Sequence, residues 1–248
     1  MELSIFAYVL AIFALAGFTK GIIGLGLPTI SMGLLAVALS PVEAAALLIL
    51  PSLVTNAWQM LDGPHLRSLV RRLWPLNLGV CLGTWAGAAF LSGLGGPYGT
   101  ATLGVALIAY ALSGLAALRL AVPAGAERWM GPVAGATTGA ITAATGVFVV
   151  PAVPYLQGIG LTKDELVQAL GLSFTVSTVA LAVILAGSNG MSIGLGLLWP
   201  SVAGVTVALA GMRLGQAVRA RLSAQTFRLW FFAGLLALGA YLAARGLL

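Results

Sequence analysis

The stretch Gly17–Thr29 reads Gly-Phe-Thr-Lys-Gly-Ile-Ile-Gly-Leu-Gly-Leu-Pro-Thr and interrupts the first apolar run of the chain. That run, Leu3–Leu39, would make a helix of roughly 55 Å, whereas the hydrocarbon core of a bilayer is about 30 Å thick. Glycine and proline near its middle predict where it folds. We therefore expect two pieces, Leu3–Thr19 and Leu27–Leu39, which form either two short crossings or a re-entrant hairpin.

A second interruption of the same kind lies at Gly135–Pro151. The surrounding run, Met130–Gly160, is again too long for one crossing, and we expect it to break near Thr145-Gly146. Backbone that leaves the helix at membrane depth is tolerated only where protein or a water-filled cavity covers it. Paired interruptions in two halves of a chain therefore point to a transporter with its substrate site near the bilayer midplane.

The composition predicts an all-α polytopic membrane protein with eight to ten membrane segments in a single integral membrane domain. The chain is 60% hydrophobic and 7% charged, whereas a soluble domain carries about 25% charged residues. The net charge of +6 is typical of basic cytoplasmic loops rather than of nucleic-acid binding. One cysteine and one histidine exclude a disulfide and a multi-ligand Cys or His metal site, so we expect no metal, no cofactor and no catalytic residue.

The other membrane segments are separated by polar stretches. We predict segments at Val42–Leu61, Leu73–Leu94, Tyr98–Leu120, Glu165–Ala186, Ile193–Met212 and Leu229–Ala244. We predict loops at Asp62–Arg72, Ala121–Trp129 and Arg213–Arg228, and a turn at Ser188–Gly190. Capping-box signatures at Ser40…Glu43 and Thr162…Glu165 mark two helix starts.

Matches in order along the chain indicate an internal duplication. Gly17 and Gly21 pair with Gly135 and Gly139, one capping box pairs with the other, and Leu73-Trp74-Pro75 pairs with Leu198-Trp199-Pro200. The first repeat covers residues 1–122 and the second covers residues 130–248. Each repeat has a glycine-broken first segment followed by three transmembrane helices.

The basic loops indicate that the repeat is inverted. In the first half the loop after the second segment is basic, whereas in the second half the basic loop comes one segment later. Since cytoplasmic loops retain Lys and Arg, equivalent loops lie on opposite sides. With an odd number of crossings in each half, the loop arginines share one side and only Arg245 falls on the other. We predict an inner (plasma) membrane protein with cytoplasmic basic loops and both termini on the outer face.

These motifs resemble those of the TauE/SafE sulfite exporter family, also called the toluene-sulfonate uptake permease family. The resemblance rests on Gly17-x-x-x-Gly21-x-x-Gly24-x-Gly26, on Leu39-Ser40-Pro41-x-Glu43-Ala44 and on the repeat of this plan at Gly135–Glu165. The stretch Gly211-x-x-x-Gly215…Arg219…Leu222 fits as well. The family often has three consecutive glycines after the first break, where this chain has Leu27-Pro28. The resemblance implies membrane transport of sulfite, sulfonates or related organosulfur anions without an enzymatic step.

The first break supplies the main candidates for the substrate site. A broken helix offers free backbone N–H groups to an anion, and Gly21, Gly24 and Gly26 would let that backbone approach it closely. The same glycines would also serve close helix packing. Lys20 would contact the anion, because a cation inside a bilayer needs a partner or a cavity. The alternative is that Lys20 reaches the cytoplasmic interface as a snorkelling residue.

Further candidates come from hydroxyl, amide and carboxylate side chains. The hydroxyls of the second break can donate to sulfonate oxygens, Gly139 is the equivalent of Gly21, and Asn56 aligns with Thr178 across the repeat. The candidates in this group are Asn56, Thr138, Gly139, Thr142, Thr145 and Thr178. Glu43 and Glu165 are candidates for proton coupling, although their capping-box positions explain them without transport.

Three other functions compete with a secondary organosulfur transporter. An EamA-like metabolite transporter shares a five-plus-five inverted design, and its substrates are often neutral or cationic. A passive anion channel would show flux without saturation or coupling. An intramembrane enzyme is disfavoured, because the chain lacks a Ser/His pair and an Asp pair inside the membrane. The identity of the anion, the direction of transport, coupling to protons or sodium and a homodimer stay open at this stage.

Overall fold

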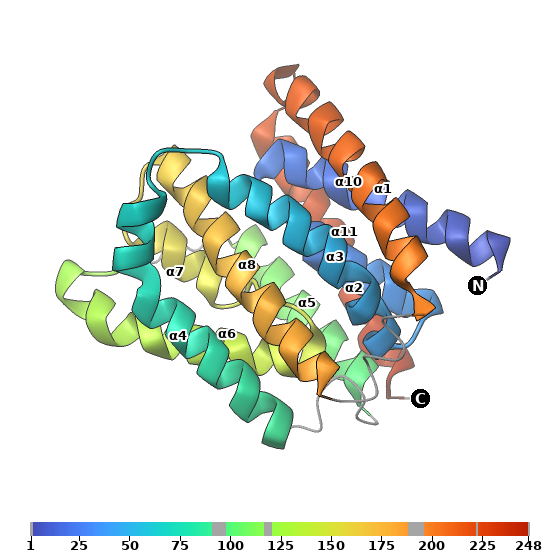
Figure 1. Cartoon of the computed structure of the whole chain (residues 1–248), viewed down its shortest axis with the longest axis horizontal. Helices are drawn as coiled ribbons and strands as arrows, with labels where there is room; N and C mark the ends of the chain where they lie inside the picture. The colour runs from blue at the N-terminus through green and yellow to red at the C-terminus, as the bar shows by residue number, and fades with distance from the viewer. Residues whose placement is uncertain (1, 91–97, 117–120, 188–195, 222, 248) are drawn as a thin grey trace.

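Helices account for all the regular structure in the residues that this computed structural model describes, which are 2–90, 98–116, 121–187, 196–221 and 223–247 (Figure 1). The first half contains α1 (Leu3–Ile23), α2 (Leu27–Ala38), α3 (Pro41–Leu61), α4 (Leu66–Phe90) and α5 (Gly99–Leu115). The second half contains η2 (Ala124–Ala126), α6 (Glu127–Thr145), α7 (Ala152–Gly158), α8 (Lys163–Ala186), α10 (Leu198–Val218), η3 (Arg219–Arg221) and α11 (Ala224–Arg245).

The surface of the bundle is suited to lipid. Within the described residues, 5 helices are long and apolar enough to cross a membrane: α1, α3, α8, α10 and α11. Large apolar side chains face outward, among them Trp85, Trp199 and Trp230, which are 72%, 80% and 74% exposed. An apolar outer surface of this extent needs a hydrocarbon environment. The prediction of an all-α, multi-pass membrane protein is therefore confirmed.

The first break folds the chain into a helical hairpin. Gly24 and Gly26 have φ angles of 77° and 108°, a left-handed conformation that glycine adopts without steric cost. Helix α2 then returns along α1, where the Tyr8 hydroxyl donates to the Leu34 carbonyl at 2.6 Å. At 12 residues, α2 is about 18 Å long and cannot cross a core of about 30 Å. The first piece was predicted to end at Thr19, but helix α1 continues to Ile23.

The second break has the same form. Gly146, with a φ of 68°, ends α6, which confirms the predicted break at Thr145-Gly146. Helix α7 returns along α6, and the Ala152 N–H at its start donates to the Thr138 hydroxyl of α6 at 3.0 Å. With 7 residues, α7 is also too short to cross a bilayer. In both halves, then, a long helix is followed by a short one that returns along it.

Two predicted loops are largely helical. Leu66–Arg72 forms the first turns of α4, and residues 213–218 continue α10 before η3 and α11 begin. Hydropathy marks where a helix leaves the hydrocarbon, but a helix whose polar turns face water continues beyond that point. The predicted segment ends at Leu94, Leu120 and Ile193 and the turn at Ser188–Gly190 lie outside the described residues.

The main packed helix pairs each join a helix of the first half to a helix of the second half. Helix α1 packs along α10 and α6 packs along α4, while α3 packs on α8 and α5 on α11 (Figure 1). Glycines bring the backbones together: a Cβ at Gly211 would collide with the Ala14 carbonyl, and one at Gly83 would collide with Ala136. Small residues spaced four apart allow this close approach between membrane helices.

The central helices α3 and α8 run antiparallel. The Gln168 amide, in the second turn of α8, donates to the carbonyls of Met60 and Gly63 at 2.8 Å each. The start of α8 therefore lies beside the end of α3. An inverted repeat requires this direction for equivalent helices. The inverted relation itself, and the repeat boundaries at residues 122 and 130, stay predictions.

An arginine side chain bonds the C-terminal end of each short helix, α2 and α7. On α4, Arg72 pairs with Glu127 of α6 at 2.6 Å and donates to the Ile159 carbonyl, just after α7, at 2.7 Å. At the end of α11, Arg245 donates to the Val37 carbonyl in the last turn of α2. Each short helix is thus fixed at its C-terminal end by a side chain from another helix.

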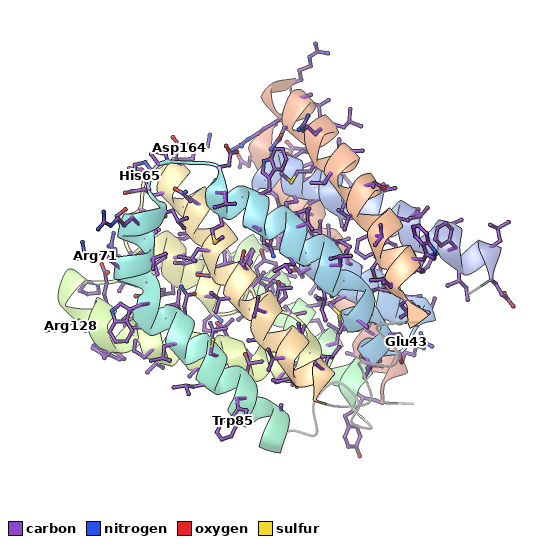
Figure 2. The ribbon with its side chains drawn as sticks, in the orientation of Figure 1. Glu43, His65, Arg71, Trp85, Arg128 and Asp164 are labelled. Carbon is purple, nitrogen blue, oxygen red and sulfur yellow. The ribbon has the colours of Figure 1, made fainter. Side chains whose placement is uncertain are left out.

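Labelled charged residues lie on both sides of the bundle. Figure 2 shows Arg71, Arg128 and Asp164 on one side of the ribbon and Glu43 on the other. Both chain ends lie on the side of Glu43 (Figure 1). The sidedness of the basic loops and of the two termini stays a prediction.

Candidate functional site

Lys20 is a buried cation in the last turn of α1. Its side chain is 3% exposed, and its ammonium group donates to the Asn56 amide oxygen and to the Thr55 hydroxyl at 3.3 Å. An ammonium group has three N–H donors. The described residues supply acceptors for two of them, so one donor is available to a ligand.

A hydrogen-bonded chain links Lys20 to α8. The Asn56 amide nitrogen donates to the Thr178 hydroxyl at 3.4 Å, and this hydroxyl donates to the Phe174 carbonyl at 2.7 Å. The structure therefore brings three predicted site residues, Lys20, Asn56 and Thr178, into one network across α1, α3 and α8.

Lys20 has no carboxylate partner among the described residues, where the single salt bridge is Arg72–Glu127. Taking a charge out of water costs several kcal/mol even after relaxation of the protein. The neutral oxygens of Thr55 and Asn56 offset only part of that cost. The site therefore has an uncompensated positive charge, which favours an anionic ligand.

A small cavity lies beside Lys20. Its volume is about 50 Å³, and it is lined by Lys20, Gly21, Gly24, Trp58, Gln59, Asp62, Val167, Met212, Gln216 and Arg219. Since a bound water needs about 10–15 Å³ by this measure, the cavity holds about three to five water-sized groups. That is the size of a small oxyanion.

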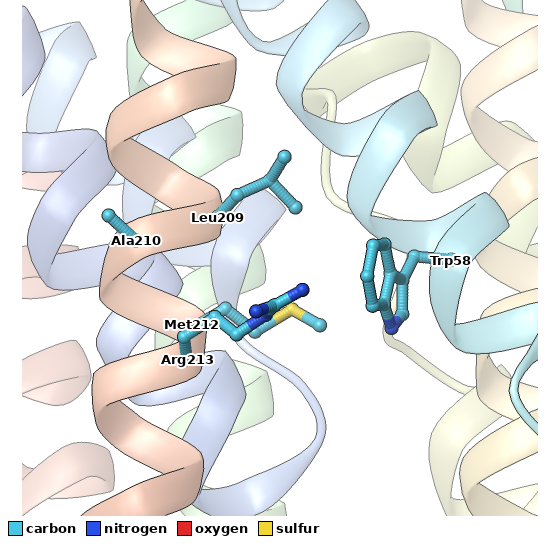
Figure 3. Close-up of a pocket in the computed structure, with 5 residues that line it drawn as sticks. All are labelled: Trp58, Leu209, Ala210, Met212 and Arg213. Carbon is cyan, nitrogen blue, oxygen red and sulfur yellow. The ribbon is translucent and has the colours of Figure 1, made fainter.

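A larger cavity of about 230 Å³ adjoins the first and shares Trp58 and Met212 with it. Its other lining residues are Leu209, Ala210 and Arg213. Figure 3 shows Arg213 of α10 and Trp58 of α3 facing one another, with the Arg213 guanidinium carbon 5.2 Å from the centroid of the Trp58 ring. This is a cation–π contact, and it places a second positive charge in the cavity next to that of Lys20.

Two of the glycines predicted for the site line the Lys20 cavity, and two pack against other helices. Gly24 lines the cavity, and a Cβ there would lie 3.8 Å from the nearest atom, in Val167. Gly21 lines the cavity too, but a Cβ there would lie 2.9 Å from the Gln216 nitrogen. Gly26 packs under Phe231, and Gly139 packs against the backbone of α4. Neither Gly26 nor Gly139 lines the Lys20 cavity.

The threonines of the second break form a separate cluster. Thr142 donates to the Thr138 carbonyl at 2.8 Å, Thr145 donates to the Ile141 carbonyl at 2.6 Å, and the Thr138 hydroxyl accepts from Ala152. A threonine hydroxyl can donate to a carbonyl of its own helix. The ammonium group of Lys20, on its longer side chain, finds its acceptors on another helix. These threonines stabilise the second hairpin and do not line the Lys20 cavity.

Sequence reasoning did not select several residues of the site. They are Thr55, Trp58, Gln59, Asp62, Arg213, Gln216 and Arg219. A signal was present in α3, where Ser52, Thr55, Asn56 and Gln59 recur with helical spacing. Four polar residues on one face of an apolar helix indicate a face turned toward a polar interior.

Glu43 and Glu165 lie at helix starts and complete the predicted capping boxes. Each carboxylate accepts from the backbone N–H of the N-cap residue three positions earlier, which is Ser40 for α3 and Thr162 for α8, at 2.9 Å. Both capping boxes are confirmed.

We expect Glu43→Gln and Glu165→Gln to retain transport, because glutamine also completes a capping box but cannot release a proton. Flux into proteoliposomes, with and without an imposed pH gradient, would measure this. Loss of gradient-driven flux in either variant, with an unchanged melting temperature, would instead support the proton-coupling hypothesis for that carboxylate.

A multi-pass helical bundle with a buried cation beside a small open cavity is suited to moving an anion across a membrane. The sequence model of the sulfite exporter TauE/SafE family matches residues 9–242. The chain therefore belongs to the TauE/SafE family of membrane transporters, which confirms the resemblance of its glycine and capping-box motifs. Searches of curated proteins and of solved structures returned no match.

Proposed function

We propose that the protein is a secondary transporter of a small anion, either sulfite or an organosulfonate, and that the anion binds at Lys20. The observation that carries the proposal is the buried Lys20 ammonium, which has a free donor, no carboxylate partner among the described residues and a small cavity beside it. Membership of a sulfite exporter family supports the chemical class of the anion.

The cavity between α3 and α10 provides the approach to this site. Arg213 lines the larger cavity and Arg219 lines the smaller one. Positive charges along a low-dielectric cleft raise the local concentration of anions and their rate of association. An anion would therefore pass Arg213 and Trp58 before it reaches Lys20.

The competing functions make different demands on this site. A carrier of cations would place a substrate next to an uncompensated positive charge, which is unfavourable by several kcal/mol in a buried site. The Lys20 cavity therefore disfavours cationic substrates of the EamA-like kind. A passive channel would conduct without saturation, so saturable flux separates the two remaining mechanisms.

Thermal stabilisation of the purified protein by a ligand panel tests the proposal. The panel holds sulfite, thiosulfate, sulfoacetate, a short carboxylate and an organic cation. A ligand at about 100 times its dissociation constant adds about 2.7 kcal/mol to stability. We expect at least one of the sulfur oxyanions to raise the melting temperature. Stabilisation by the cation alone would contradict the proposal.

A further inference from the structure

Gln59 holds the tip of the first hairpin and leaves one polar atom without a partner. Its side chain is 6% exposed, and its amide nitrogen donates to the Gly24 carbonyl at 2.9 Å and to the Val167 carbonyl at 2.8 Å. These two bonds use both amide hydrogens. The amide oxygen of Gln59 is buried and has no hydrogen-bond partner among the described residues.

The orientation of this amide follows from its neighbours. A rotated amide would place its oxygen against the carbonyl oxygens of Gly24 and Val167, and both contacts would become repulsive. The amide nitrogen must therefore face these carbonyls. Because Gln59 and Lys20 both line this cavity, a small ligand there lies beside one side chain with an unused donor and another with an unused acceptor.

The charges around the cavity suit a single negative charge. The lining residues include two cations, Lys20 and Arg219, and one carboxylate, Asp62. Their sum is one positive charge. A dianion would leave the site negative and would also face the Asp62 carboxylate, which is unfavourable.

We propose that the Lys20 cavity selects small monoanionic oxyanions that also carry an O–H or N–H donor. An oxygen of the anion accepts from the third N–H of Lys20, and the donor of the anion bonds the free amide oxygen of Gln59. Hydrogensulfite has this combination, whereas fully deprotonated sulfite does not. This inference rests on the proposed binding of an anion at Lys20 and specifies which anions bind.

A matched pair of ligands tests the inference without a change of pH. Sulfamate and methanesulfonate have the same charge and nearly the same size, but sulfamate has an amino group where methanesulfonate has a methyl group. Isothermal titration of the full-length purified protein would give both affinities. We expect the wild type to bind sulfamate at least tenfold more tightly, because the methyl group leaves the Gln59 oxygen unpaired.

Variants test whether Gln59 causes the preference for sulfamate over methanesulfonate. In Gln59→Met the two affinities should become equal, whereas Gln225→Met, an exposed position at the start of α11, should retain the preference. Equal affinities in the wild type, or a preference that survives in Gln59→Met, would overturn the inference. The comparison in the wild type decides the question even if Gln59→Met does not fold.

Failure of the proposed function gives a different result. If neither anion binds the wild type, or if Lys20→Met binds both as tightly as the wild type does, anion binding at Lys20 is wrong and the inference falls with it. If both anions bind equally and both lose affinity in Lys20→Met, only the selection through Gln59 is wrong.

Discussion

Lys20→Met should lower saturable anion flux by at least about 30-fold, the equivalent of about 2 kcal/mol. Methionine has nearly the length of lysine and removes the charge, so the variant keeps the packing of α1 and loses the attraction for the anion. The measurement is the uptake of labelled sulfite into proteoliposomes at equal protein content.

The same variant should not lose stability. Removal of the ammonium leaves the Asn56 oxygen unpaired, at a cost of about 1–3 kcal/mol. It also removes a buried charge whose desolvation costs several kcal/mol. We therefore expect the melting temperature of the ligand-free protein to stay the same or to rise. Loss of function without loss of stability is typical of a residue retained for activity.

Lys163 provides the matched control, since it is the only other lysine in the chain and lies exposed at the start of α8. Lys163→Met should transport at the wild-type rate. Wild-type flux in Lys20→Met would remove Lys20 from the substrate site and would favour a purely structural role for it.

Gly83→Ala should destabilise the protein by about 1–3 kcal/mol, the usual cost of an added methyl group in a packed interior. A Cβ at Gly83 would lie 2.6 Å from the Cα of Ala136. Because the obstacle is backbone and not a flexible side chain, α4 and α6 must move apart. Thermal unfolding in detergent would show a melting temperature several degrees below that of the wild type.

A second helical glycine, which is not packed against another helix, serves as the control for helix propensity. Gly234, in α11, has no atom within 4 Å of the place that a Cβ would occupy. Gly234→Ala should therefore raise stability, by up to about 1 kcal/mol from propensity alone. Equal effects of the two substitutions would show that close packing of α4 on α6 does not stabilise the fold.

Local patterns predicted most of the fold. The apolar runs and capping boxes located nearly all the helices, because hydropathy and capping depend on residues close together in the chain. The second break was placed correctly, but the first was predicted to begin too early, after Thr19, and Gly17 and Gly21 lie inside α1. Glycine permits both a break and a close helix contact, and only the partner helix decides between them. Since α10 lies more than 170 residues later in the chain, no local signal could identify that contact.

The site was predicted only in part for the same reason. Lys20 stood out because a cation in an apolar run demands an explanation, and Asn56 and Thr178 followed from the internal duplication. Thr138 was selected as a hydroxyl of the second break. The sequence could not show that Thr138 already bonds α7. Gln59 was missed because an amide near a helix end is unremarkable until its two partners, the Gly24 and Val167 carbonyls, are known.

The two ends of each short helix are held by different kinds of contact. Arg245 bonds the C-terminal end of α2, and Arg72 bonds the carbonyl just after α7. The glycine tip of the first hairpin is held instead by Gln59, through the Gly24 carbonyl, and it lies directly after Lys20. An anion bound as proposed at Lys20 and Gln59 would therefore contact the side chain that positions this tip, so occupancy of the site and the position of the hairpin tip would depend on the same amide group.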